Sequence, residues 1–399
     1  MSLNNLINSV HSHLSMSEDE AVSLLTKISN TFKNNFFSKN QLKNIQEDVE
    51  ILFSVLKSSG YIEEYIQCDC EEETEIYPLT TTHCDYCNQL LKNTFVHELR
   101  ELFKLKSELS QELNLRNEEI LKSVIDDSFL DFFYELKENI DNIIPFLGAG
   151  TSIPLGLDNW PNLLHGMARS LKPQDKDYFK KLIDKGDYLG AIEALKNNTL
   201  SLTTDDSIKK HIVRQIEAKY KSGLAENYHN IKDIINLEPA FFITTNYDSS
   251  LIDFKNGDKY PYTLDQIEDA HELLNKGDQI VLHLHGHIRV LKSMIITKED
   301  YENLYKDDRI KDYLKAIMGT KNLLFIGFSF DDQYFKDIFY NSFKNLGGQH
   351  FIIQNNIHLD EARDMIKEGL RPISIKVEKT NEFSNNYVKA LKIVLKNLL

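Results

Sequence analysis

Four clusters of glycine and polar residues each follow a short apolar segment, and their residue types suit a ligand that contains phosphate and ribose. Glycines lack a Cβ, so they let backbone N–H groups lie close to a diphosphate, and a helix N-terminus behind them adds a favourable dipole. An amide can hold a ribose hydroxyl or a water, and a histidine can act as a general base near neutral pH. The clusters are Gly148-Ala149-Gly150-Thr151-Ser152, Thr244-Thr245-Asn246-Tyr247-Asp248, His283-Leu284-His285-Gly286 and Gly327-Phe328-Ser329-Phe330-Asp331-Asp332.

Each cluster also has an ordinary structural explanation. The pattern that begins at Gly148, G-x-G-[ST], also occurs in tight strand-to-helix turns that bind no ligand. Asn246 is equally suited to cap a turn, and a single histidine such as His285 is more often structural than catalytic. The clusters therefore indicate a site only if the fold brings them together.

The apolar segments before these clusters predict the strands of a parallel sheet. They are short and wholly apolar, and helical patterns separate them, which is typical of strands that are buried on both faces. We therefore expect a Rossmann-like, doubly wound α/β domain over residues 142–399, with a helical insertion at about 160–236. The carboxyl ends of such strands meet at one edge, where ligands bind. The expected strands are 142–148, 239–246, 279–286, 322–329, 350–354 and 373–379.

Residues 1–141 have a different pattern and form a separate, mainly helical region. Apolar residues recur every three or four positions over 42–60 and 90–125, with charges between them, which predicts amphipathic helices. Between these segments, residues 75–80 (EIYPLT) predict a short strand and turn.

All four cysteines lie in that interruption, at Cys68, Cys70, Cys84 and Cys87, and 13 residues separate the two pairs. In a reducing compartment, two close thiolate pairs are better suited to tetrahedral Zn²⁺ than to a disulfide. We expect a structural zinc site in a hairpin over about 66–90, in which His83 is an alternative ligand. Four ordinary reduced thiols are the other explanation. Nothing in the segment indicates the open coordination position of a catalytic zinc.

Composition restricts the partners of the chain. Acidic residues outnumber basic ones by 61 to 46 among 399 residues, and the net charge of -15 disfavours a broad nucleic-acid surface. The N-terminus has no secretory pattern, and no run of about 18 uncharged apolar residues occurs. We therefore expect a cytoplasmic protein with no membrane contact.

In order along the chain, GAGTSIPLG…NW, TTNYD, HLHG and GFSFDD resemble the NAD-binding domain of the sirtuin superfamily. The match is closest to a bacterial sirtuin-like branch that is found in antiphage defence proteins, and it covers roughly residues 142–399. The resemblance implies that NAD⁺ is the substrate. It also implies that cofactor-binding residues include Gly148, Ala149, Gly150, Thr151 and Ser152 at the diphosphate, Trp160 where the flexible loop ends, and Gly327, Ser329 and Asp331 on the adenosine side.

The resemblance also implies three catalytic residues. Asn246 and Asp248 would lie beside the nicotinamide ribose, and His285 would act on the ribose hydroxyls or on a water. His283 precedes the His-Gly pair that carries the resemblance and His287 follows its glycine, so His285 is the histidine we assign.

Two departures from the deacylase pattern favour hydrolysis. Deacylases of this superfamily usually carry a four-cysteine zinc module after the His-Gly pair, but residues 288–399 here contain no cysteine. The first loop reads PLGLDNWP and lacks the usual Pro-Asp-Phe-Arg-like stretch. We therefore expect an NAD⁺ glycohydrolase that acts in antiphage defence. The alternatives are a protein deacylase or ADP-ribosyltransferase, and a non-catalytic module that binds NAD or a nucleotide signal.

Residues 1–141 carry none of these motifs, and we expect them to take part in control. Amphipathic helices and a zinc hairpin are suited to self-association or to docking a partner. We expect a homo-oligomer that stays inactive until an activating partner protein or nucleotide signal binds. The simpler alternative is that this region only covers an exposed face of the catalytic domain.

Overall fold

The computed structural model describes residues 2–70, 73–92, 98–257, 259–266, 279–306, 321–328, 349–378, 380 and 382–399. The chain divides into two compact units, Met1–Ile120 and Leu121–Leu399, and the boundary falls within helix α4 (Ser107–Val124).

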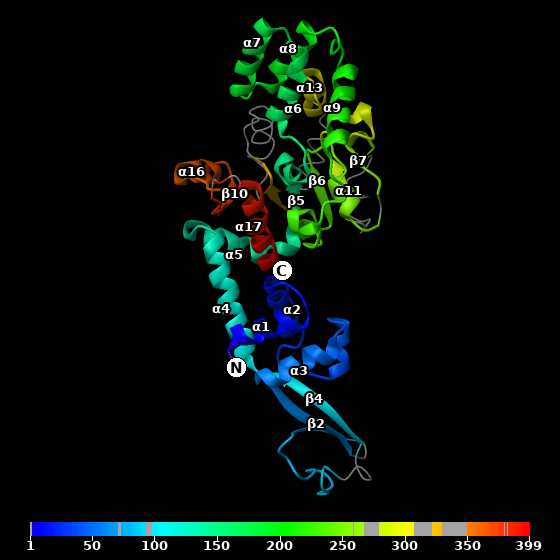
Figure 1. Cartoon of the computed structure of the whole chain (residues 1–399), viewed down its shortest axis with the longest axis vertical. Helices are drawn as coiled ribbons and strands as arrows, with labels where there is room; N and C mark the ends of the chain where they lie inside the picture. The colour runs from blue at the N-terminus through cyan, green and yellow to red at the C-terminus, as the bar shows by residue number, and fades with distance from the viewer. Residues whose placement is uncertain are drawn as a thin grey trace. The chain divides into compact units, whose positions relative to one another are not determined.

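Unit 1 combines helices with an antiparallel sheet (Figure 1). Helix α1 packs against α2 and α3, and their apolar faces form one core with the inner side chains of the sheet. A reciprocal capping box between Ser17 and Glu20 begins α2, and Gly60 ends α3 in the left-handed conformation that glycine favours. The sheet has the order β1-β4-β2-β3. The elements are α1 (Leu3–His13), α2 (Glu18–Thr31), β1 (Phe36–Phe37), α3 (Val49–Ser59), β2 (Ile62–Cys70), β3 (Glu73–Pro78) and β4 (Glu98–Leu105).

The helix expected over 90–125 is only partly present. Strand β4 occupies Glu98–Leu105, and the helix α4 begins at Ser107. β4 pairs antiparallel with β2 from Ile62↔Leu105 to Asp69↔Glu98, and Phe103 and Leu105 are buried on one face. Alternate residues of a strand share a face, so the apolar residues at the end of β4 fit the strand period of two as well as the helical period. Pairing with β2 makes the segment a strand.

Unit 2 is built on a seven-stranded sheet of order β11-β10-β9-β5-β6-β8-β7, in which every described pairing is parallel. This confirms the predicted doubly wound, Rossmann-like α/β fold. The chain runs from β5 outward to β6 and β8 and then crosses to β9 on the other side of β5, so the strand order reverses between β5 and β9. The strands are β5 (Ile143–Leu147), β6 (Phe241–Thr244), β7 (Tyr262–Thr263), β8 (Ile280–His283), β9 (Asn322–Ile326), β10 (His350–Asn355) and β11 (Leu370–Ile375).

The helices of unit 2 fall into two groups. Helices α5, α16 and α17 pack against β11, while α10 packs against α11 and α17. Helices α6, α7, α8 and α9 gather with α13 at one end of unit 2 (Figure 1), and α6 to α9 share a separate apolar core. The helices are α5 (Leu130–Glu138), α6 (Trp160–Met167), α7 (Pro173–Asp184), α8 (Tyr188–Asn198), α9 (Asp205–Lys219), α10 (Ile231–Ile235), α11 (Ser250–Phe254), α13 (Lys298–Lys306), α16 (Leu359–Lys367) and α17 (Phe383–Leu398).

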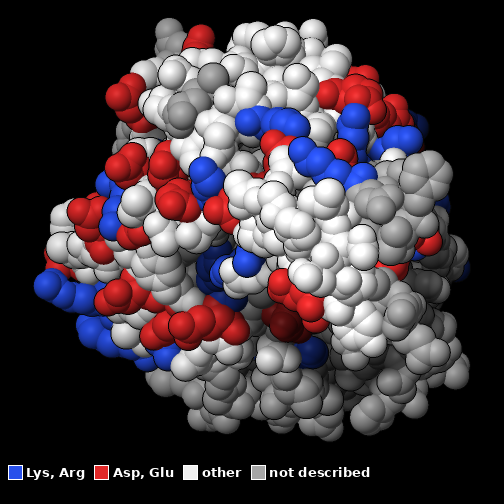
Figure 2. Space-filling model, turned by 90° about the horizontal axis from the view of Figure 1, so that it is seen from below, with Lys and Arg blue, Asp and Glu red and all other residues white. Residues whose placement is uncertain are grey.

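The charge of the surface is mixed on the face shown in Figure 2, where basic and acidic side chains are interspersed. None of the helices in the described ranges is long and apolar enough to span a bilayer.

Candidate functional site

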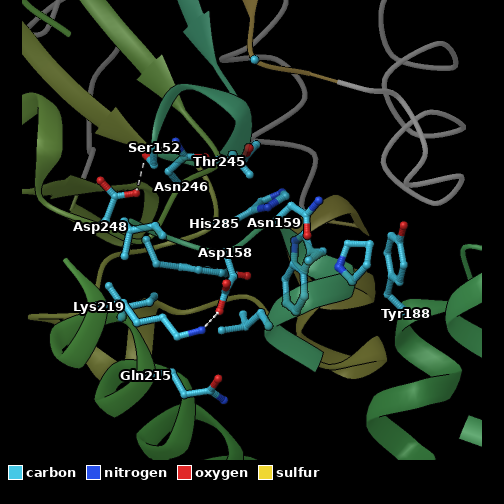
Figure 3. A pocket seen from close by; sticks show the side chains of 18 of the residues that line it. Ser152, Asp158, Asn159, Tyr188, Gln215, Lys219, Thr245, Asn246, Asp248 and His285 are labelled. Carbon is cyan, nitrogen blue, oxygen red and sulfur yellow. Dashed lines mark hydrogen bonds and ion pairs between the residues drawn. The ribbon is translucent and has the colours of Figure 1, made fainter. Parts of the chain in front are cut away.

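A cleft opens at the carboxyl ends of β5, β6, β8 and β9, beside the point where the strand order reverses (Figure 3). It is partly open to solvent. Ligands of open α/β sheets bind at this location. The cleft residues that follow the strands are Ala149, Ser152, Thr245, Asn246, Tyr247, Asp248, His285, Gly327 and Phe328.

Close backbone contact explains the glycines at the reversal point. A Cβ on Gly148 would lie 2.6 Å from the carbonyl oxygen of Gly327, and one on Gly150 would lie 2.8 Å from the Gly327 Cα. Gly327 has a φ of +77°, and its own Cβ would lie 2.6 Å from the backbone nitrogen of Thr151. The glycines therefore let the first loop (residues 148–159, between β5 and α6) touch the loop after β9.

The backbone N–H groups of this corner mostly bond within the protein. Those of Gly148 and Gly150 donate to Ile326 and Gly327, and those of Thr151 and Ser152 donate to carbonyls of the corner itself. The helix expected directly behind the glycines is replaced by two 3-10 turns, Ala149–Thr151 and Ile153–Leu155, and α6 begins only at Trp160. Pro154 and Gly156 divide this segment, which disfavours a continuous helix.

Asn246 is fixed by contacts with the first loop. Its side-chain nitrogen donates to the Gly148 carbonyl (3.0 Å), to the Ser152 hydroxyl (3.1 Å) and to the Thr151 hydroxyl (3.3 Å). Its backbone N–H donates to the Thr244 hydroxyl. Because the donors of the amide are directed at the first loop, its carbonyl oxygen is the group left to act on a ligand in the cleft.

Ser152 connects Asn246 to Asp248. The Ser152 hydroxyl accepts from the Asn246 amide and donates to the Asp248 carboxylate at 2.8 Å, as the dashed line in Figure 3 marks. The other Asp248 oxygen accepts from the Ser250 N–H at 2.9 Å. Ser152 and Asp248 are both buried, so the carboxylate has a fixed orientation.

His285 is the one member of the 283–287 histidine group that lines the described cleft. Its ring lies edge-on to Tyr301, with 5.1 Å between ring centroids. Burial lowers the pKa of His285 to about 3, so the imidazole is neutral at physiological pH. It can accept a hydrogen bond from a ligand hydroxyl, but it is a weak base in the free protein.

The opposite wall of the cleft comes from the first loop and the helical insertion. The Trp160 ring lies edge-on to Tyr247 at 6.0 Å, and the Tyr247 hydroxyl donates to Ile295. Lys219, at the end of α9, forms an ion pair with Asp158 (Figure 3), and it is the only Lys or Arg among the described lining residues. Tyr188 and Gln215 line the same wall.

The sequence prediction identified the sheet side of the cleft and Trp160 on the opposite wall, but it missed the other residues of that wall. Asp158 and Lys219 are 61 residues apart and carry no motif, so only the tertiary fold reveals their proximity. The predicted residues that line the cleft are Ala149, Ser152, Trp160, Asn246, Asp248, His285 and Gly327, whereas Gly148, Gly150 and Thr151 form the adjoining corner. Ser329 and Asp331 lie outside the described residues.

The cysteine segment forms a small cluster in unit 1. Cys68 and Cys84 are buried together with Tyr77 and Leu91, and Cys87 packs against them. Burial raises the pKa of Cys84, but hydrogen bonds from the N–H groups of Cys87 and Tyr86 have the larger combined effect. The pKa of Cys84 is therefore lowered, to about 7. Burial and the Cys84 sulfur raise the pKa of Cys68 to about 11. The side chain of Cys70 is not described. Among the described side chains, Cys68, Cys84 and Cys87 included, no group of three or more His, Cys, Asp or Glu is placed to hold a metal.

Comparison with known proteins shows what part of the sheet region resembles. Residues 240–373 match the model of the SIR2-like domain. This confirms the predicted resemblance to the sirtuin superfamily, and the matched range contains Asn246, Asp248 and His285.

Three curated relatives have the same name, NAD(+) hydrolase ThsA. The protein from Enterococcus faecium is 30% identical over 198 residues, which cover 48% of this chain and 38% of the relative. The one from Cytobacillus dafuensis is 29% identical over 216 residues, covering 53% and 39%. The one from Bacillus cereus (strain MSX-D12) is 27% identical over 216 residues, covering 51% and 40%. The chain thus matches about two fifths of the length of these relatives.

Proposed function

We propose that this protein is an NAD⁺ hydrolase that cleaves the bond between nicotinamide and ribose. The observation that carries the proposal is the convergence of Asn246, Asp248 and His285 on one cleft of a SIR2-like sheet. The names of the curated relatives support the same activity. A cleft that combines aromatic and aliphatic side chains with a few fixed polar groups suits a dinucleotide.

The reaction needs little acid catalysis. Nicotinamide is cationic in NAD⁺ and leaves as a neutral base with the electron pair of the broken bond, while water adds to C1′ of the ribose and loses a proton. The transition state resembles an oxocarbenium ion, so orientation and electrostatics carry most of the rate. The side-chain carbonyl of Asn246 orients the ribose or the water. Asp248 orients the nicotinamide side of the substrate. His285 accepts a hydrogen bond from a ribose hydroxyl or from the attacking water.

Two substitutions test the assignment. Asn246→Ala and His285→Ala should each lower NAD⁺ turnover by about 100-fold or more, since each removes a positioned catalytic group. The matched controls are Asn236→Ala and His358→Ala, which change the same residue types at exposed positions outside the cleft. Nicotinamide release without an acylated peptide would distinguish hydrolysis from deacylation. Near wild-type turnover in both site variants would contradict the proposal.

We also propose that Cys68, Cys70, Cys84 and Cys87 hold a structural Zn²⁺. The clustering of three of these thiols supports it, as do the backbone N–H groups directed at the Cys84 sulfur. About one Zn²⁺ per chain should copurify, and a Cys84→Ser/Cys87→Ser double variant should lose it and destabilise unit 1. Elemental analysis that finds no zinc in protein prepared without chelator would contradict this.

The biological role we propose is regulated NAD⁺ depletion in antiphage defence, with unit 1 taking part in control. A cell does not tolerate unrestrained NAD⁺ hydrolysis, so we expect an oligomer that an activating protein or nucleotide signal switches on. NAD⁺ hydrolysis with and without candidate activators, together with light scattering, tests this. Full activity in a monomer without additive would exclude it.

A further inference from the structure

A second histidine, His283, lies directly behind the candidate catalytic residue Asn246. It ends β8, is 1% exposed and does not line the described cleft. Its Nδ1 lies 2.9 Å from the backbone carbonyl oxygen of Asn246. A carbonyl only accepts hydrogen bonds, so Nδ1 must carry the ring proton.

That bond fixes the tautomer of His283. With the proton on Nδ1, Nε2 is a bare acceptor, and it has no hydrogen-bond partner among the described residues. Burial lowers the pKa of His283 to about 4, which keeps the ring neutral. The nearest charged groups that act on it are Asp248 and Arg289, in opposite directions. Within the described ranges, the bond to Asn246 is therefore the hydrogen bond that holds this fully buried imidazole.

His287, which follows the His-Gly pair, supports the other end of the same loop. The Nδ1 of His287 accepts from the Arg289 N–H at 3.1 Å, so its Nε2 carries the proton and donates to the Ser249 hydroxyl at 3.1 Å. The rings of His283 and His287 lie edge to face, with 4.6 Å between centroids. The two histidines thus contact residues 246 and 249 from the side away from the cleft.

Asn246 is consequently held from two sides. The first loop accepts its side-chain N–H bonds at Gly148, Thr151 and Ser152, and His283 donates to its backbone carbonyl. Contacts to the side chain alone leave the backbone free to rotate, and contacts to the backbone alone leave the rotamer free. Both together define where the side-chain carbonyl oxygen of Asn246 points.

We infer that His283 is a positioning residue. Its Nδ1 donates to the backbone carbonyl of Asn246 and thereby sets the side-chain carbonyl oxygen of Asn246 in its working orientation. This inference rests on the proposed NAD⁺ hydrolysis. His283 does not touch the substrate. Its effect should therefore appear in kcat more than in KM, because a misdirected Asn246 still leaves the cleft open to NAD⁺.

Two variants of His283 separate positioning from packing. The side-chain nitrogen of asparagine reaches the position of Nδ1, whereas leucine fills the space without a donor. We expect His283→Leu to lower kcat about 10-fold or more with KM changed less than about 3-fold, on the scale of one lost hydrogen bond at a catalytic group. His283→Asn should recover kcat to within about 3-fold of the wild type.

A matched control is available in β10. His350 is also buried, its pKa is also lowered to about 4 by burial, and its Nδ1 accepts from a strand N–H, that of Leu323. It lies outside the described cleft. His350→Leu should lower stability as His283→Leu does, but it should leave kcat unchanged.

Amide hydrogen exchange over residues 244–250 gives a readout that does not depend on turnover. Exchange should speed up in His283→Leu, and stay at the wild-type rate in His283→Asn and in His350→Leu. Unchanged kcat or unchanged exchange in His283→Leu would overturn the inference, as would an asparagine variant as defective as the leucine variant. If the wild-type protein hydrolyses no NAD⁺ with any activator, the proposed function fails instead, and the exchange data alone decide whether His283 holds Asn246.

Discussion

Acidification should destabilise unit 2 strongly, because burial lowers the pKa of five of its buried histidines, His229 and the four that follow. Burial lowers the pKa of His283 to about 4, of His285 to about 3, of His287 to about 2 and of His350 to about 4. An unfolded chain would titrate each near 6.5. Below that pH the unfolded state binds more protons than the folded state, so the free energy of unfolding falls as the pH falls.

The size of the effect follows from these pKa values. Between pH 7 and pH 5, a histidine whose pKa drops from about 6.5 to 4 or below costs about 1.8 kcal/mol of stability. Four such groups cost about 7 kcal/mol, which is comparable with the whole stability of a typical domain, about 5–15 kcal/mol. Asp233 acts in the opposite direction, because burial raises its pKa, and it offsets part of the loss. We therefore expect unit 2 to be close to unfolding at pH 5.

The single tryptophan of the chain, Trp160, lies in unit 2 and reports on it directly. Guanidinium unfolding followed by its fluorescence at pH 7, 6 and 5 measures the effect. His350→Asn removes one titrating group and keeps an acceptor for the Leu323 N–H, so the loss between pH 7 and 5 should shrink by about 1.8 kcal/mol. The exposed His358→Asn variant is the control. Equal stability at pH 7 and pH 5, or a pH dependence that His350→Asn leaves unchanged, would refute the reasoning.

Three further predictions concern the cleft. Gly327→Ala should destabilise unit 2 by about 2 kcal/mol or more in the same unfolding assay, because the new Cβ would meet the Thr151 backbone. The control is Gly257→Ala, at φ +81° with nothing within 4 Å, which should cost only about 1 kcal/mol. Equal costs would contradict the close-contact argument. Ser152→Ala should lower kcat for NAD⁺ about 10-fold, because Asn246 and Asp248 each lose a hydrogen bond, and an unchanged kcat would show that the bridge is dispensable. Lys219→Met should raise KM for NAD⁺ roughly 3- to 10-fold, because the Asp158 carboxylate would then face an anionic substrate unpaired, and Lys210→Met, which breaks an exposed ion pair with Asp206 on the same helix, should leave KM unchanged.

The sheet and its edge could be predicted from the sequence because their signals are local. All five residues of β5 are buried and so are all four of β6 and of β8, so each strand is a continuous apolar run in the sequence. The polar residues after these strands needed only the rule that parallel strands end at one edge. That rule was enough to place Asn246, Asp248 and His285 together.

The rest depends on contacts between distant segments. β4 is a strand because β2 pairs with it, and the helical spacing of its apolar residues does not show this. The glycine corner follows a recognisable pattern, but the close approach of Gly327 is what requires Gly148 and Gly150 in the structure, and the expected ligand contact stays a prediction. Likewise, the ion pair of Lys219 with Asp158 exists only because α9 ends beside the first loop.

The two walls of the cleft therefore have different origins. The SIR2-like match begins at residue 240 and includes the wall with Asn246, Asp248 and His285, together with the histidines behind it. It excludes the first loop and the helical insertion, which supply Trp160, Lys219 and their neighbours. If the wall within the SIR2-like match carries out the chemical step and the other wall binds the substrate, substitutions on the two walls should affect different kinetic constants. Those at residues 246, 283 and 285 should act mainly on kcat, and those at residues 158 and 219 mainly on KM, because only the first group fixes the reacting atoms. A set of variants in which both walls changed kcat alike would show that the insertion takes part in the chemical step.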